Sequence, residues 1–130
     1  MKESIFKAGD TKHHSFIVGP NDFAKFQGEI LHKVCSTYKL GQEMEWSSRL
    51  FMLDLIEVHE EGVGTMLHID HLNPAFANEK VDIIAKFKSF EQNHLLCDIE
   101  VKVGDRLIAK GQTGQKLLSK EKLRTLFSIH

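Results

Sequence analysis

The segment Tyr38-Lys39-Leu40-Gly41-Gln42-Glu43-Met44-Glu45-Trp46, which continues without proline to Val58, decides how this chain folds. Its small or apolar residues recur at steps of three and four, the period of one helical face; they are Leu40, Met44, Ser47, Phe51, Leu55 and Val58. Ser36 or Thr37 can cap the first free amide groups. The pattern predicts a helix from about residue 38 to residue 58. Four further apolar residues widen the face, so we expect cover on more than one side: Trp46, Leu50, Leu53 and Ile56.

On both sides of this segment the hydrophobic period changes to two, the period of a β-strand. Before it, residues 14–18 alternate as far as a turn at Gly19-Pro20. After it, alternating runs begin near residues 67, 81 and 95. Turn signals at Gln92-Asn93 and Gly104-Asp105 predict hairpins between the strands that begin near 81 and 95, and between the latter and a last strand after residue 105. Residues 21–34 show no clear period, and we expect a packed loop there rather than a lid. A short helix is expected from Ser119 to Phe127.

The predicted order of elements is a strand, a long helix and then at least four antiparallel strands. A twisted sheet with one apolar face must cover that face, and the helix from about 38 to 58 is the only long element available. We therefore expect an α+β hot-dog fold, an antiparallel twisted sheet wrapped around a long central helix. A two-layer sandwich of sheet and helix with another connectivity is left open by the pattern. Residues 1–130 are expected to form a single domain, as the chain length suggests.

The composition argues against two classes of partner. With 17 basic and 18 acidic residues the formal net charge is -1, so no overall field would draw the protein to nucleic acid or to an anionic membrane. The densest apolar run, residues 50–53, is far too short for a membrane span, and the first residues lack the apolar core of a signal peptide. We expect a cytoplasmic protein with no nucleic-acid and no membrane partner.

Neither the cysteines nor the histidines form a metal-binding pattern. Cys35 and Cys97 lie far apart and lack CxxC spacing, so we expect packed, reduced thiols rather than a disulfide or a nucleophile. Among the eight histidines, His68 and His71 would fall on opposite faces of a strand, and no ligand cluster emerges. The sequence predicts no metal.

A hydroxyl, a carboxylate and an imidazole fall where the predicted helix and strands meet: Thr37, Glu45 and His71. Such groups can activate a nucleophile, attack a carbonyl and protonate a leaving group. Taken singly, they are also typical of a helix cap, a helix-surface acid and a strand-end histidine. Thr37 and Glu45 would be about 12 Å apart along a continuous helix. Thr37 is therefore expected in a loop that folds back before the helix, or the site must combine groups from two subunits.

Residues from about Val34 to Leu118 resemble the hot-dog thioesterase family typified by the fluoroacetyl-CoA thioesterase. The resemblance lies in Ser36-Thr37, Met44-Glu45-Trp46, Val63-Gly64-Thr65, His71-Leu72-Asn73-Pro74 and the tail from Gly104 to Gly111. The catalytic threonine, glutamate and histidine of the family match Thr37, Glu45 and His71. The glycine after its helix matches Gly64.

The resemblance implies an enzyme, an acyl-CoA thioesterase that releases free acid and CoA. Glu45 would be the general base or the nucleophile, assisted by Thr37 and His71, and the substrate would contact Gly64, Ser36 and Asn73. No cofactor is implied, because coenzyme A is part of the substrate. The resemblance also implies a homodimer, or a dimer of such dimers, with active sites at the subunit interface. Two other functions stay open: a non-catalytic acyl-CoA binding or sensing module, and hydratase or dehydratase chemistry on a CoA-linked chain.

The chain departs from the family at the end of the last strand. The family often carries a histidine and an arginine after the glycine matched by Gly111, where this chain has Gln112, Thr113 and Gln115. The resemblance therefore does not extend to a preference for fluoroacetyl-CoA, and the sequence does not identify the acyl group. At two turns where the family often has glycine, this chain has Asn78 and Asn93, which also tolerate left-handed backbone geometry.

Overall fold

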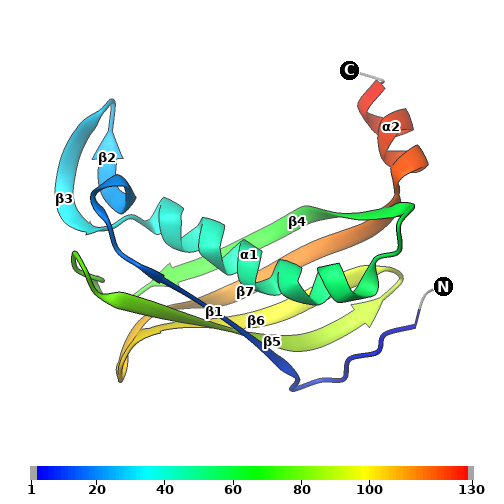
Figure 1. Cartoon of the computed structure of the whole chain (residues 1–130), viewed down its shortest axis with the longest axis horizontal. Helices are drawn as coiled ribbons and strands as arrows, with labels where there is room; N and C mark the ends of the chain where they lie inside the picture. Colours follow the sequence, from blue (N-terminus) through cyan, green and yellow to red (C-terminus); the bar gives the residue numbers. More distant parts are fainter. Residues whose placement is uncertain (1–2, 129–130) are drawn as a thin grey trace.

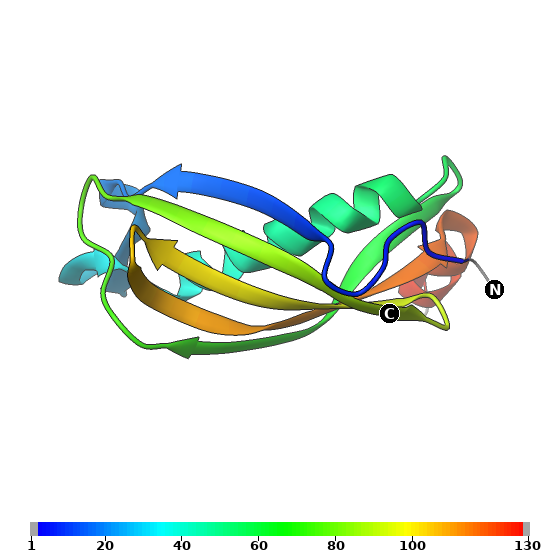
Figure 2. The ribbon, with the colours of Figure 1, turned by 90° about the horizontal axis from the view of Figure 1, so that it is seen from below.

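A computed structural model describes residues 3–128, and its main body is one long helix lying on a twisted antiparallel sheet (Figure 1). The sheet contains five strands in the order β1-β5-β6-β7-β4, which can be followed in Figure 2. Their bounds are β1 Thr11–Ile17, β4 Glu60–His71, β5 Lys80–Glu91, β6 His94–Val103 and β7 Arg106–Ser119. This arrangement confirms the predicted hot-dog fold. Among the described residues, no helix is long and apolar enough to span a bilayer.

The helix α1, Thr37–Leu55, packs on the sheet through the face that the sequence predicted. Ser36 is its N-cap, and the Ser36 hydroxyl accepts a hydrogen bond from the Lys39 amide at 3.0 Å. The buried side is formed by Leu40, Gly41, Met44, Ser47, Ser48, Phe51, Met52 and Leu55. The helix ends three residues before the predicted Val58, because Ile56 is already extended and the main chains of Glu57 and Glu60 form a turn.

The outer side of α1 is not covered, and here the prediction was wrong. Trp46 is 43% exposed and Leu53 is 44% exposed. Within residues 3–128 the elements that pack on the helix are chiefly the strands of the sheet, and no described layer covers Trp46 and Leu53. This leaves apolar side chains on the surface beside α1.

The predicted hairpins are confirmed. Gln92 and Asn93 both have positive φ angles, 52° and 62°, and join β5 to β6, while Gly104, with a φ of 58°, lies between β6 and β7. The first strand lies slightly earlier than predicted, at Thr11–Ile17, and pairs antiparallel with residues 80–86 of β5. The predicted C-terminal helix is α2, Lys120–Ser128, which projects from the end of β7 (Figure 1).

Residues 21–34 were wrongly predicted as a packed loop. After a short helical turn η1, Pro20–Asp22, they form an antiparallel hairpin of β2, Phe23–Phe26, and β3, Glu29–Cys35, that projects beyond the sheet (Figure 1). Gln27 and Gly28, both with positive φ, make its tight turn. Register shifts near Ala24 break the alternation, which is why no period was visible in the sequence. Three apolar side chains of the hairpin are exposed: Phe26, Ile30 and Leu31.

The core lies between α1 and the concave face of the sheet. Phe51 of the helix meets Phe6 and Phe87 at centroid distances of 4.9 and 5.7 Å, in edge-to-face geometry. Cys35 and Cys97 are buried and unpaired, as expected, and desolvation raises the pKa of each thiol to about 12.

Candidate active site

Thr37 and His71 meet where α1 begins and β4 ends. β4 follows α1 in the chain and returns along it, so its last residue lies beside the first turn of the helix (Figure 1). The Thr37 Oγ1 atom is 2.8 Å from Nδ1 of His71, within hydrogen-bond distance. Thr37 is the first residue of α1, not part of a loop before it, because Ser36 provides the cap. The structure thus brings two of the three predicted catalytic residues into direct contact.

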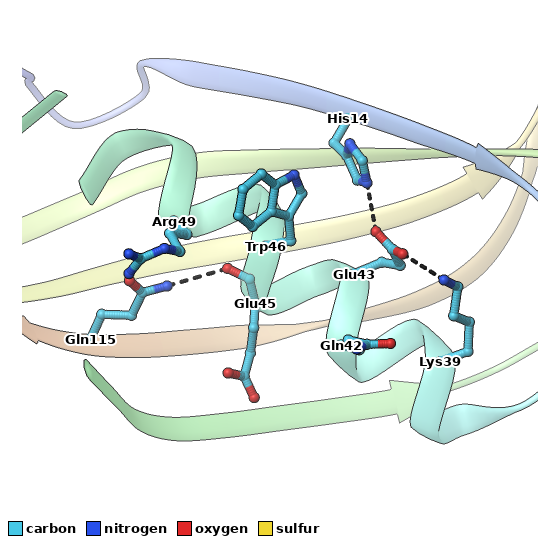
Figure 3. A pocket seen from close by; sticks show the side chains of 8 residues that line it. All are labelled: His14, Lys39, Gln42, Glu43, Glu45, Trp46, Arg49 and Gln115. Atoms are coloured by element: carbon cyan, nitrogen blue, oxygen red, sulfur yellow. Dashed lines mark hydrogen bonds and ion pairs between the residues drawn. The ribbon is translucent and has the colours of Figure 1, made fainter. Parts of the chain in front are cut away.

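Glu45 lies two turns further along α1 and directs its carboxylate toward β4, away from His14 and Trp46 (Figure 3). A Cβ added to Gly64 of β4 would be 3.3 Å from Oε2 of Glu45. The missing side chain at Gly64 therefore leaves the space in which the carboxylate lies. Among the described residues, neither a hydrogen bond nor an ion pair reaches the Glu45 carboxylate. Glu45 is an exposed residue.

A pocket of about 350 Å³ connects these groups along the seam between α1 and β4. We call it the α1–β4 pocket; its lining residues are Thr37, Tyr38, Gly41, Gln42, Glu45, Leu67 and Ile69. A Cβ on Gly41 would be 3.0 Å from Leu67, so the small residue lets the strand approach the helix closely. Because Thr37 and Glu45 line the same pocket, one bound molecule can contact both, despite the eight residues between them.

The three other predicted site residues lie at the two ends of this seam. Gly64 is beneath the Glu45 carboxylate, as described. Ser36 uses its hydroxyl as the helix cap. Asn73 lies two residues beyond His71 and donates its amide to the Leu107 carbonyl at 2.8 Å. Neither Ser36 nor Asn73 lines the α1–β4 pocket.

A second, larger pocket of about 520 Å³ lies on the outer side of α1 (Figure 3). It shares Gln42 and Glu45 with the first pocket, and its other lining residues are His14, Lys39, Glu43, Trp46, Arg49 and Gln115. We call it the outer pocket. The sequence pattern does not predict this pocket, although Lys39 and Glu43 have the i,i+4 spacing of a helical ion pair.

An ion network runs along one wall of the outer pocket. Glu43 lies 2.7 Å from Lys39 and 2.5 Å from Nε2 of His14, while Lys39 also lies 3.5 Å from Asp22. Desolvation alone would raise the pKa of Glu43, but the hydrogen bonds and charges of Lys39 and His14 outweigh it, so the net pKa is lowered. The hydrogen bond to Glu43 in turn raises the pKa of Lys39. Glu43 is thus held ionised by its neighbours.

One group of described residues has the spacing of a metal site: Glu57, His59 and Glu60, whose ligand atoms lie within 4.8 Å of one another. It follows the C-terminus of α1, at the opposite end of the helix from Thr37. This group was not predicted, because its residues come from a turn rather than from one strand face. Exposed acidic groups of this kind are common without an ion, and the absence of a metal stays a prediction.

Comparisons with known proteins identify the family. Residues 18–121, more than half of the chain, match the family model described as FlK, fluoroacetyl-CoA-specific thioesterase. No curated protein matches significantly. Three solved structures superpose over nearly the whole chain.

The first is a hypothetical protein of Thermus thermophilus described as a thioesterase superfamily member, with a TM-score of 0.90 and 28% identity over 94% of this chain and 90% of that chain. The second is a variant of the fluoroacetyl-CoA-specific thioesterase FlK in complex with fluoroacetate and CoA, with a TM-score of 0.84 and 21% identity over 91% and 99% of the two chains. The third is a hot-dog-like protein from Thermanaerovibrio acidaminovorans, with a TM-score of 0.86 and 16% identity over 94% and 90%. With this fold and this family match, the chain belongs to the fluoroacetyl-CoA-specific thioesterase family and is a thioester hydrolase.

Proposed function

We propose that the protein hydrolyses an acyl-CoA thioester to the free acid and CoA in the α1–β4 pocket. The observation that carries the proposal is the contrast within this one pocket. At one end the Thr37 hydroxyl is hydrogen-bonded to His71, and at the other the Glu45 carboxylate has no partner among the described residues. A carboxylate without an ion-pair partner, in the same pocket as an oriented hydroxyl, provides the groups that carbonyl hydrolysis needs.

In the proposed reaction the thioester carbonyl lies between Glu45 and Thr37. Glu45 removes a proton from water, and the resulting hydroxide attacks the carbonyl carbon. The C–S bond then breaks, and the thiolate of CoA leaves with the proton that Glu45 had taken. In the proposed reaction Nδ1–H of His71 donates to Oγ1 of Thr37, so the single Thr37 hydroxyl hydrogen is free to donate to the oxygen that becomes negative. Alternatively, Glu45 itself attacks, and water releases the acid from the mixed anhydride.

The proposal includes a homodimer formed along β4. This strand is the edge of the sheet, it is 12 residues long, and none of its residues is buried in the single chain. Met66 and Leu67, 37% and 41% exposed, add apolar surface beside the pocket. A long exposed edge with apolar side chains is normally paired or covered. A second copy pairing along β4 would cover the α1–β4 pocket and remove water from around Glu45.

The proposed acyl group is short or branched and apolar. The pocket, at about 350 Å³, is at the small end of the range of ligand pockets, and its walls include Leu67 and Ile69. Within residues 3–128 the lining includes no positively charged side chain, which argues against an acid group at the far end of the acyl chain.

The test is a thiol-release assay with a panel of acyl-CoA substrates: acetyl, isobutyryl, phenylacetyl and succinyl. We expect release from acetyl-CoA and isobutyryl-CoA, and little from phenylacetyl-CoA or succinyl-CoA. Binding of acyl-CoA by calorimetry without thiol release would favour a sensing module instead. Addition of water to an enoyl-CoA with the thioester intact, detected by mass spectrometry, would favour a hydratase.

Two measurements refine the proposal. Light scattering on a sizing column tests the dimer, and Leu67→Glu should shift the protein toward monomer and lower the rate. A single turnover in ¹⁸O water with enzyme in excess, combined with rapid acid trapping of any acylated enzyme, separates the two roles of Glu45. Label in the peptide that contains Glu45, or a trapped acyl adduct of that peptide, supports the nucleophile. Label in the acid alone, with no trapped adduct, supports the base.

A further inference from the structure

We infer that Gln115 is a positioning residue for Glu45. The side-chain amide of Gln115, on β7, holds the turn of α1 that carries the catalytic carboxylate. The inference rests on the proposed function only in taking Glu45 as the catalytic group. The contacts behind it are independent of the substrate.

The Gln115 side-chain amide donates a hydrogen bond to the main chain of the helix at Glu45. Gln115 is 5% exposed, and its Nε2 atom lies 3.2 Å from the main-chain oxygen of Glu45 (Figure 3). The same Nε2 atom lies 3.0 Å from Oγ of Ser48. Because a peptide carbonyl can only accept, the amide must present its nitrogen and not its oxygen to Glu45. This defines one orientation of the side chain.

Ser48 is hydrogen-bonded to both Gln115 and the Glu45 carbonyl. It is fully buried, and its hydroxyl donates to the same Glu45 carbonyl at 2.9 Å. Two side chains therefore converge on one main-chain oxygen, and between residues 3 and 128 the Gln115 bond is the one hydrogen bond from a sheet side chain to the main chain of α1. The other polar contacts between the helix and the strands use side chains of the helix: Thr37 with His71, Glu43 with His14, Asp54 with Lys12, and Arg49 with Glu61 and the Gly62 carbonyl. They do not hold a main-chain atom of the helix.

The position of Gln115 in the sheet strengthens the argument. Gln115 on β7 pairs with Gly64 on β4, the glycine beneath the Glu45 carboxylate. One point of the sheet thus fixes the backbone of Glu45 through Gln115 and leaves space for its side chain through Gly64. A small shift of the helix turn would move the carboxylate relative to the pocket, and small misplacements of reacting groups are costly in rate.

Stability alone does not explain a glutamine here. No donor among the described residues reaches Oε1 of Gln115, so a buried carbonyl oxygen is left unsatisfied. Methionine has a similar length and would avoid this cost, and the Glu45 carbonyl would still accept from Ser48. A polar residue that carries a stability penalty next to the candidate catalytic group indicates a role in the reaction.

The test compares Gln115→Met with Gln112→Met. Gln112 is on the same strand and donates its amide to Asp98 at 2.8 Å, remote from Glu45, so it is a matched control. We expect Gln115→Met to lower kcat about tenfold, with KM nearly unchanged and an unfolding temperature equal to or above that of the wild type. Gln112→Met should keep the wild-type kcat.

A double-mutant cycle identifies the route of the effect. In a Glu45→Gln background, Gln115→Met should have no further effect on the residual rate, because there is no carboxylate left to position. An equal loss in both backgrounds would overturn the inference. If Gln115→Met does not fold, Ser48→Ala replaces it in the same cycle, with a smaller loss of kcat expected. A wild-type protein that releases no thiol would remove the proposed function, whereas an active wild type and a fully active, folded Gln115→Met would remove only the role of Gln115.

Discussion

Glu43 and Glu45 are two residues apart on the same helix, yet their carboxylates have opposite surroundings (Figure 3). Glu43 faces β1 and is held by Lys39 and His14. Glu45 faces β4 and has no partner among the described residues. The ionised carboxylate of Glu43 is stabilised by its two neighbours, which lowers its pKa and its tendency to accept a proton. The difference separates a structural acid from a candidate catalytic one, and each experiment below tests it.

The largest effect is expected from removing the free carboxylate. Glu45→Gln should lower kcat about a thousandfold, because the amide is nearly isosteric but cannot act as a base or nucleophile. Glu43→Gln is the matched control and should stay within about threefold of wild type, since its partners lie outside the reaction path. Thiol-release kinetics check both. Equal losses at the two positions would contradict the distinction.

Breaking the pair at the other end of the pocket should have the next largest effect. His71→Ala is expected to lower kcat about a hundredfold, and Thr37→Ala somewhat less, because each removes one side of the same hydrogen bond. The double variant should be little worse than His71→Ala alone, since residues that act as a unit are not additive. A His71→Ala protein that is active but melts much earlier would indicate a structural histidine.

Filling the space beneath the Glu45 carboxylate should lower kcat by a moderate factor. Gly64→Ala places a Cβ 3.3 Å from Oε2 of Glu45, which displaces the carboxylate by a few tenths of an ångström, and we expect kcat to fall about tenfold. Gly104→Ala, at a turn far from the pocket, would strain a residue with a φ of 58° and should affect stability instead. Kinetics and thermal melts on both variants check this.

The smallest effect is expected on the Glu43 side of the comparison, and it concerns stability in acid rather than activity. The folded-state pKa of Glu43 is lowered, so its contribution is fully present above its ordinary pKa of 4.5 and is lost as the pH falls below that value. The unfolding temperature of wild type should therefore drop more steeply than that of Glu43→Gln in acid. Melts at pH 7 and at successively lower pH values measure the difference, and parallel curves would mean that the network contributes nothing.

Much of the fold could be predicted from the sequence because long periodic segments decide it. The helix face at Leu40, Met44, Phe51 and Leu55, and the turn residues Asn93 and Gly104, each have a local physical cause that is visible in the chain. The hairpin at residues 23–35 was missed because its register shifts destroy the alternation. The exposure of Trp46 was also missed, since an apolar residue gives no sign of whether this chain or another one covers it.

The candidate site could be predicted only in part. The contact between Thr37 and His71 follows from the order of helix and returning strand, once the fold is known. The role of Gln115 was not accessible, because a hydrogen bond between residues 70 positions apart depends on the register of β7 against α1. The contrast between Glu43 and Glu45 likewise depends on which strand each side chain faces.

The burial of both sulfurs matters for an enzyme whose chemistry generates a thiol. Cys35 and Cys97 are 1% and 0% exposed and, with pKa values near 12, carry almost no thiolate at neutral pH. They therefore resist mixed-disulfide formation when the released CoA oxidises. A chromogenic disulfide reagent will count only product while the protein is native, and it will count two further groups per chain once denaturant opens the core. One reagent can thus follow both catalysis and the loss of the native state.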